Sequence, residues 1–266
     1  MTVLSRRGQR GNPKRTDAAK SGDRLGVTVR AVGLAIGVAY VIRLLTLGGY
    51  YAELGGVVGA DCLAGLTLWR LGRIRSLPRA QLLENIGYLT VFALAIAVTV
   101  LARPKWLATA GAWPWYVAGL VVGLCLIWVS GLRPAAIASG ELAFLAGSKP
   151  VADTIVGSAI LLAAGAAEEV MFRGPALARP LPAAIQAALL GAVLFVARHH
   201  FPGWASVRRS AARIYAIEIA SSLAFVILTI MSGSIYPAVV AHVISNCPAV
   251  IILIQRGRME DSNHGI

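Results

Sequence analysis

The decisive stretch of this sequence is an apolar run that contains two adjacent glutamates: Ile160-Leu-Leu-Ala-Ala-Gly-Ala-Ala-Glu168-Glu169-Val-Met-Phe-Arg173-Gly174. Apart from its charged residues, this run has the composition of a membrane-spanning helix. An ionised carboxylate in a bilayer costs about 3 kcal/mol on insertion scales, so such residues usually pair, face a cavity or take part in chemistry. Two of them, followed closely by an arginine, predict an active site within the membrane.

The composition of the whole chain supports a membrane location. The chain has 266 residues, of which 57% are hydrophobic and 14% charged, whereas soluble domains carry about 25% charged residues. Apolar stretches near the roughly 20 residues that cross a bilayer recur eight times. These stretches are 31–49, 54–69, 86–102, 115–132, 152–172, 183–198, 215–231 and 236–254. We therefore predict an all-α polytopic membrane protein with about eight transmembrane helices in one bundle.

The charge distribution predicts the orientation. The net charge is +13. If both termini face the cytoplasm, 20 of the 25 Lys and Arg residues fall in cytoplasmic segments and four, including Arg173, fall in the opposite loops. This asymmetry is typical of the positive-inside pattern. We expect an integral protein of the bacterial cytoplasmic membrane with both termini cytoplasmic, and we attribute the basic charge to the lipid bilayer rather than to nucleic acid.

Three parts follow from this pattern. Residues 1–28 are basic and rich in small residues, which predicts a disordered cytoplasmic tail. Residues 29–255 form the transmembrane helical domain, and residues 256–266 form a short cytoplasmic tail. The first four spans contain two charged residues, Arg43 and Asp61, for which the simplest interpretation is a mutual ion pair or an Arg43 side chain that extends to the interface. We interpret these four spans as packing scaffold.

The two glutamates differ in what they can reach from one helix. Glu169 and Arg173 are four residues apart, so they share a helix face and can form an ion pair in the favourable order. Glu168 is rotated from Glu169 by about 100° and cannot easily share that arginine. One carboxylate is thus neutralised within the helix, and the other is left to face a cavity, where it suits a general base.

Two further polar elements follow within apolar spans. The first is Phe195-Val-Ala-Arg-His199, in which Phe195 and His199 lie one helical turn apart. The second is His242-Val-Ile-Ser-Asn246, in which His242 and Asn246 share one face in the middle of a span. A lone imidazole at that depth is costly without a partner. We expect His242 and Asn246 to form a small polar face directed at the interior of the bundle.

The three elements together resemble the CPBP family of intramembrane proteases, which includes the type II CAAX prenyl endopeptidases and bacteriocin-processing or immunity proteins. The family pattern is Glu-Glu-x-x-x-Arg, then Phe-x-x-x-His, then His-x-x-x-Asn, and residues 150–255 follow it in order and with similar spacing. Two residues depart from the pattern. Arg198 stands where the family more often has a small apolar residue, and Pro175 closely follows the arginine.

The resemblance implies a protease-like transmembrane domain and a role for each motif. Glu168 would deprotonate a water that His199 orients. His242 and Asn246 would donate hydrogen bonds to the oxyanion of the tetrahedral intermediate, where donors in a dry site act most strongly. The residues in a supporting role would be Glu169, Arg173 and Phe195.

An alternative assigns the same side chains to a metal. Glu168, His199 and His242 would then be the ligands of a catalytic zinc with an open water position. The residue types suit both mechanisms, and the resemblance favours the one without a cofactor. No His-Glu-x-x-His motif of the usual zinc metalloprotease helix occurs in the chain.

The leading hypothesis is therefore an intramembrane endopeptidase, of glutamic or metallo type, that hydrolyses a membrane-associated or lipidated peptide or a lipoprotein-like substrate. A second hypothesis is a non-catalytic CPBP-like immunity or scaffold protein that binds a membrane peptide in the same cavity. A third is a proton-coupled transporter that uses the Glu and His cluster as a relay. The clustering of ionisable residues in three motifs, with no internal repeat, argues against transport.

Overall fold

The structure, a computed structural model, describes residues 31–264 apart from residue 33 and the segments 72–79 and 200–207. Every regular element within these residues is a helix, which agrees with the predicted all-α class. A helix over Leu34–Leu45 comes first. The long helices that follow are α2 (Gly49–Leu71), α3 (Ala80–Ala102), α4 (Trp113–Ser130), α7 (Val151–Phe172), α8 (Leu181–His199), α9 (Arg208–Ser232) and α10 (Tyr236–His264). The short helices are α5 (Pro134–Ala138), α6 (Glu141–Ala146) and two 3₁₀ turns, Lys105–Ala108 and Gly174–Ala176.

Six of the described helices are long and apolar enough to cross a membrane. They are Leu82–Ala102, Trp113–Ser130, Val151–Ala176, Leu181–His199, Arg213–Ser232 and Tyr236–Glu260. They correspond to the last six predicted stretches. The helices that cover the first two, Leu34–Leu45 and α2, are not among the six, so the count of eight spans is not confirmed.

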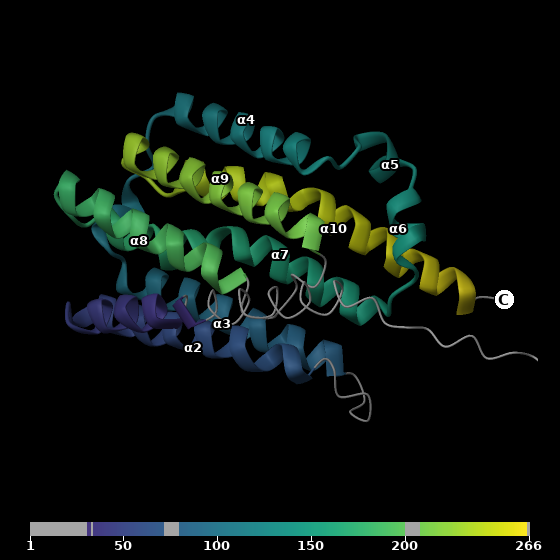
Figure 1. The fold of residues 1–266 in the computed structure, drawn as a ribbon, viewed down its shortest axis with the longest axis horizontal. Coiled ribbons are helices and arrows are strands. Elements are labelled where there is room, and N and C mark those ends of the chain that lie inside the picture. The colour runs from purple at the N-terminus through teal and green to yellow at the C-terminus, as the bar shows by residue number, and fades with distance from the viewer. Residues whose placement is uncertain (1–30, 33, 72–79, 200–207, 265–266) are drawn as a thin grey trace, which may run out of the picture.

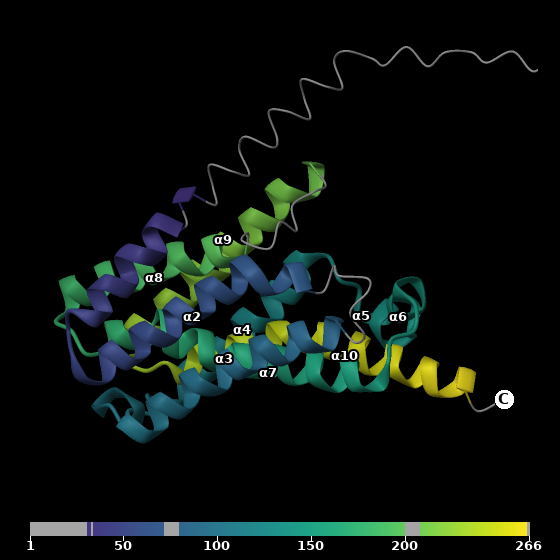
Figure 2. The same cartoon turned by 90° about the horizontal axis from the view of Figure 1, so that it is seen from below.

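Helix α7, which carries both glutamates, lies in the middle of the bundle (Figure 1). The helices α4, α10, α7, α3 and α2 pack side by side in that order, and the contact between α7 and α10 is the most extensive in the molecule. Helices α8 and α9 pack against each other, to one side of this row (Figure 2). Helix α8 also packs against α7, and α9 packs against α10. Side chains on α7 can therefore meet residues from both halves of the chain.

Two glycines let the neighbouring helices approach α7 closely. A Cβ atom on Gly165 of α7 would lie 2.7 Å from a side-chain atom of Val243 and 3.2 Å from its backbone nitrogen. A Cβ atom on Gly191 of α8 would overlap the carbonyl oxygen of Phe172. Small residues at such contacts allow backbones to pack tightly in a membrane protein. The close approach brings the His242 and His199 helices against the glutamate helix.

The end of α7 is buried. Arg173, which the charge count places in an external loop, caps this helix and has 0% exposure. The hydroxyl of Tyr40, from the helix Leu34–Leu45, donates a hydrogen bond of 2.9 Å to the carbonyl of Met171. That bond satisfies one of the carbonyl groups that a helix end leaves without an intrahelical partner.

The structure describes only one of the two predicted boundaries of the transmembrane domain. The predicted tail 1–28 lies outside the described residues. At the other end, α10 continues as helix to His264, beyond residue 255, where we expect the transmembrane domain to end.

Candidate active site

The predicted ion pair between Glu169 and Arg173 is confirmed. Arg173 Nη1 lies 3.3 Å from Glu169 Oε1, and both side chains have 0% exposure. The other end of the guanidinium donates to the hydroxyl of Ser222 on α9 at 2.7 Å. Its central carbon lies 4.5 Å from the ring centroid of Phe195 and 5.6 Å from that of Phe225. Arg173 therefore links α7 to both α8 and α9.

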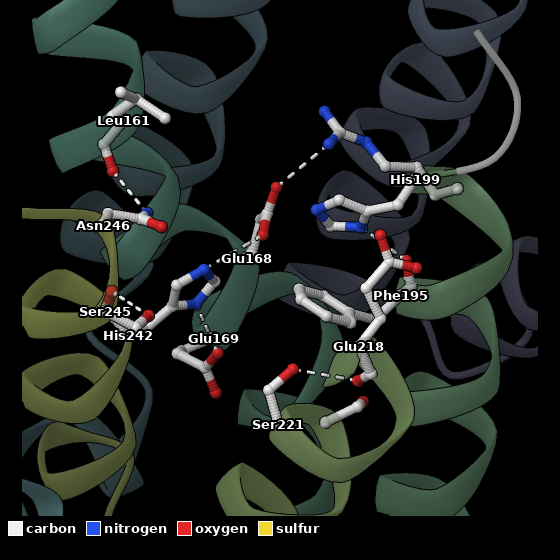
Figure 3. A network of polar contacts seen from close by, with 12 residues as sticks. Leu161, Glu168, Glu169, Phe195, His199, Glu218, Ser221, His242, Ser245 and Asn246 are labelled. Carbon is white, nitrogen blue, oxygen red and sulfur yellow. Dashed lines mark hydrogen bonds and ion pairs between the residues drawn. The ribbon is translucent and has the colours of Figure 1, made fainter. Parts of the chain in front are cut away.

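His242 lies between the two glutamates (Figure 3). Its Nδ1 is 3.0 Å from Glu169 Oε1, and its Nε2 is 3.6 Å from Glu168 Oε2. The imidazole stacks on Phe225 with a centroid distance of 5.0 Å, and Phe195 meets it edge-on at 5.8 Å. The position and plane of the ring are thus fixed from three sides, with only 7% of the side chain exposed.

Glu168 is buried beside a second arginine that the family pattern does not contain. Its Oε1 accepts a hydrogen bond of 3.0 Å from Arg198 Nη1, and 2% of the side chain is exposed. Arg198 also binds Asp61 of α2 with two bonds of 2.9 Å, from Nε and Nη2. Of the two interpretations for Arg43 and Asp61, the mutual ion pair is therefore wrong, and an Arg43 side chain that extends outward is the one that remains. Asp61 instead pairs with Arg198, and the Arg43 side chain is exposed.

His199 and Phe195 lie on one face of α8, as their spacing predicts. The Nδ1 of His199 lies 2.8 Å from the carbonyl oxygen of Phe195. A carbonyl can only accept, so Nδ1 carries the hydrogen, and Nε2 of the neutral ring keeps its lone pair. The rings of Phe195 and His199 are 4.5 Å apart. Figure 3 shows the imidazole turned toward Glu168.

Asn246 lies one turn after His242 on α10. Its Nδ2 donates a hydrogen bond of 2.8 Å to the carbonyl of Leu161 on α7 (Figure 3). One of its two N–H donors is thus committed to the main chain, and the second remains for another acceptor. The predicted polar face is present, because both His242 and Asn246 line the same cavity.

This cavity has a volume of about 780 Å³ and contains Glu168, Arg198, His199, His242 and Asn246 in its wall. From these polar groups it follows one face of α7 and one face of α10. The α7 residues in its wall are Gly157, Ile160, Leu161 and Ala164, and the α10 residues are Asn246, Ala249, Ile252 and Leu253. The wall also includes Lys149, just before α7 begins. Glu84, Asn85 and Glu218 also line the cavity, which is thus a largely apolar groove in whose wall the ionisable side chains of the three motifs cluster.

The predicted zinc ligands do not form a metal-binding set in this arrangement. Among the described residues, no group of three or more His, Cys, Asp or Glu side chains is placed to hold a metal ion. His242 has one ring nitrogen bound to Glu169 and directs the other at Glu168. The side chains of the site instead pair with one another.

The structure therefore brings together all the site residues that the three motifs predict. The sequence-based interpretation missed the contributions of other helices. Neither interpretation of Asp61 pairs it with Arg198, Arg198 stands out in the sequence only as a departure from the family pattern, and the sequence gives no signal for Ser222 and Phe225 of α9. A charged residue within an apolar helix is the signal that could have identified Asp61 and Arg198 as partners, because such residues pair within the bundle.

Comparison with known proteins agrees with the motif analysis. The family model for Type II CAAX prenyl endopeptidase Rce1-like proteins matches residues 150–248. No match was found among curated proteins or among solved structures. The matched segment covers α7, α8, α9 and the part of α10 that contains His242 and Asn246. Residues 150–248 are therefore similar to the Type II CAAX prenyl endopeptidase Rce1-like family, in agreement with the resemblance to the CPBP family of intramembrane proteases.

Proposed function

We propose that this chain is an intramembrane endopeptidase that hydrolyses a peptide bond with a water activated by Glu168. The observation that carries the proposal is the position of Glu168. Its carboxylate is buried in the wall of a largely apolar groove, and one oxygen, Oε2, has no hydrogen-bond partner among the described residues. A buried oxygen of this kind can accept a proton from a water in the groove.

The proposed reaction is supported by the hydrogen-bond geometry. Glu168 takes a proton from water, and the resulting hydroxide attacks the carbonyl carbon of the peptide bond. The tetrahedral intermediate then breaks its C–N bond while Glu168 returns the proton to the leaving amine. The products are a carboxylic acid and an amine, and transfer of the acid's proton to the amine leaves a carboxylate and an ammonium group. The lone pair on Nε2 of His199 accepts the second hydrogen of the water and so orients it.

His242 and Asn246 are the donors for the developing oxyanion. Because Nδ1 of His242 is committed to Glu169, only Nε2 faces the groove. Donation from both ring nitrogens requires the imidazolium form, for which the two flanking glutamates supply the counter-charge. Asn246 contributes the N–H that Leu161 does not use. Fixed donors aimed at the position of the developing oxyanion would stabilise it in the proposed reaction.

The groove indicates the class of substrate. Its apolar walls on α7 and α10 suit an extended apolar segment of peptide or a hydrocarbon chain. Proteins named as type II CAAX prenyl endopeptidases act at prenylated C-termini, and we extend that class to this chain. The substrate is thus a membrane-associated or lipidated peptide, and the enzyme works in the bilayer with both termini cytoplasmic.

The test is peptide cleavage by the purified full-length protein in lipid nanodiscs. The probe is an internally quenched peptide ending in a farnesylated Cys-aliphatic-aliphatic-Ser sequence, with the non-farnesylated peptide beside it. We expect cleavage by the parent protein and a fall in kcat of about 10²- to 10⁴-fold for Glu168→Gln, as the loss of a general base predicts. Glu53→Gln removes an exposed carboxylate from α2 and is the matched control.

Two results would reject this mechanism. Cleavage by Glu168→Gln at the parent rate excludes Glu168 as the base. If the parent binds the farnesylated peptide, measured by fluorescence anisotropy, and yet cuts neither peptide, the non-catalytic binding protein is favoured instead. A parent protein that loses activity with a chelator and regains it with zinc would show that the reaction depends on a metal.

A further inference from the structure

Arg198 is the junction of three helices at the site. From α8 it directs one N–H bond at Glu168 on α7 and two at Asp61 on α2. The two bonds to Asp61 join the planar guanidinium to both carboxylate oxygens, each at 2.9 Å. A bidentate contact of this kind fixes the plane of the guanidinium as well as its position. The direction of Nη1, which binds Glu168, is thereby fixed too.

Aromatic rings of α3 hold the same guanidinium from the side. The central carbon of Arg198 lies 5.3 Å from the ring centroid of Phe92 and 5.7 Å from that of Tyr88. Both distances fall within the range of favourable cation–π contact. Two elements of the first half of the chain, α2 and α3, therefore determine where Arg198 lies.

The charges of the cluster give Asp61 a role in how Arg198 binds Glu168. Glu169 has Arg173 as its own cation, whereas Glu168 and Asp61 share Arg198. Two of the three bonds from Arg198 go to Asp61, which is itself 0% exposed. Without that carboxylate, Arg198 would turn to Glu168 alone and could pair both of its oxygens. The oxygen that the proposed reaction needs would then be occupied.

We propose that Asp61 and Arg198 form a clamp that orients Glu168 toward the groove, so that α2, which lies outside the matched segment 150–248, completes the active site. Only the expected effect on kcat rests on the proposed function; the placement of Glu168 by Asp61 and Arg198 does not. Asp61 acts through Arg198 and is a positioning residue. A purely structural ion pair would need only the bidentate contact and would not direct a third bond at Glu168.

The first test measures thermal unfolding of the full-length protein in detergent and needs no substrate. With Asp61 removed, Arg198 depends on Glu168 as its remaining carboxylate. We therefore expect Glu168→Gln to lower Tm by roughly 2–4 °C more in the Asp61→Asn background than in the parent. In the Arg198→Met background this coupling should vanish. Glu53→Gln and Arg43→Met, which remove exposed charges, serve as controls for the carboxylate and the arginine.

The second test is steady-state cleavage of the farnesylated peptide. Misplacing Glu168 predicts that Asp61→Asn lowers kcat on the order of 10- to 100-fold with KM nearly unchanged. Arg198→Lys keeps the positive charge but loses the planar guanidinium that binds both oxygens of Asp61. It should lower kcat while Tm stays close to the parent value. Asp61→Asn should cause no further loss of kcat in an Arg198→Met background. If Asp61→Asn does not fold, the double variant Asp61→Asn/Arg198→Met, which removes both members of the long-range ion pair, still tests the loss of kcat.

The outcomes separate the two proposals. Absence of the Tm coupling overturns the clamp, whatever the peptide assay shows. Coupling with an unchanged kcat in Asp61→Asn, or in the double variant, overturns the positioning role and leaves a structural ion pair. A parent protein that cuts no peptide refutes the proposed function, and the Tm measurement still decides whether Asp61 holds Arg198 against Glu168.

Discussion

The two buried arginines of the site have the same kind of surroundings but receive their carboxylates from different places. Arg173 pairs with Glu169, four residues earlier in the same helix, and lies over two phenylalanine rings. Arg198 pairs with Asp61, 137 residues away, and lies over Tyr88 and Phe92. The side chain of Arg173 is fully buried, whereas that of Arg198 is 11% exposed and borders the groove.

The difference shows which parts of the site are local. Any helix with the Glu-Glu-x-x-x-Arg pattern brings Glu169 and Arg173 together, because residues four apart share a face. The contact between Asp61 and Arg198 exists only when α2 packs at one rotation beside α8. The local pair therefore follows from the spacing within the motif, whereas the long-range pair depends on how α2 packs beside α8.

Breaking the local pair should have the largest effect on stability. Arg173→Met leaves the buried Glu169 with its contact to His242 but without the arginine, and it removes the bond to Ser222. We expect a loss of about 3–5 kcal/mol of unfolding free energy, the usual result of leaving a buried charge without its partner. Thermal unfolding in detergent measures it. A loss below that of Arg43→Met, an exposed arginine, would contradict the importance of the pair.

Breaking the long-range pair should cost less. Asp61→Asn leaves Arg198 with Glu168 as a partner and keeps one acceptor oxygen at position 61. We expect a loss of about 2 kcal/mol, within the range for hydrogen bonds to charged groups. The same unfolding measurement, made beside Arg173→Met, ranks the two pairs. An Asp61→Asn protein less stable than Arg173→Met would reverse the comparison.

Removing an aromatic contact of Arg198 should have the smallest effect on stability. Tyr88→Leu removes a ring from Arg198 while Tyr88→Phe retains it. We expect Tyr88→Leu to lose about 0.5–1 kcal/mol more than Tyr88→Phe, which is the size of a partly exposed cation–π contact. If the two variants unfold at the same temperature, the ring adds nothing to the placement of Arg198.

The part of the structure that depends on local spacing was predictable. The spacing of Glu169 and Arg173 predicts their ion pair, and the spacing of His242 and Asn246 predicts their shared face. The apolar stretches predict the helices, although six helices of the described residues, rather than eight, are long and apolar enough to be spans.

Contacts between distant helices were not predictable from spacing. Arg43 is nearer to Asp61 along the chain, yet Arg198 is its partner, because the rotation of α2 decides which helix Asp61 faces. In a membrane bundle apolar side chains occupy all sides of a helix, so hydrophobic periodicity does not reveal that rotation. The roles of Ser222 and Phe225 depend in the same way on how α9 packs beside α7.

The position of Glu168 along α7 determines how many residues of the proposed peptide substrate would have to lie in the groove. Glu168 lies 17 residues after Val151, the first residue of the helix, which is about 26 Å at 1.5 Å per residue. The groove extends from Glu168 to Lys149, just before that helix begins. A chain that follows it needs about eight extended residues to span this length. If the proposed substrate enters at the Lys149 end, a folded domain attached by fewer residues would keep the scissile bond from reaching Glu168, and the proposed enzyme would then favour unstructured tails.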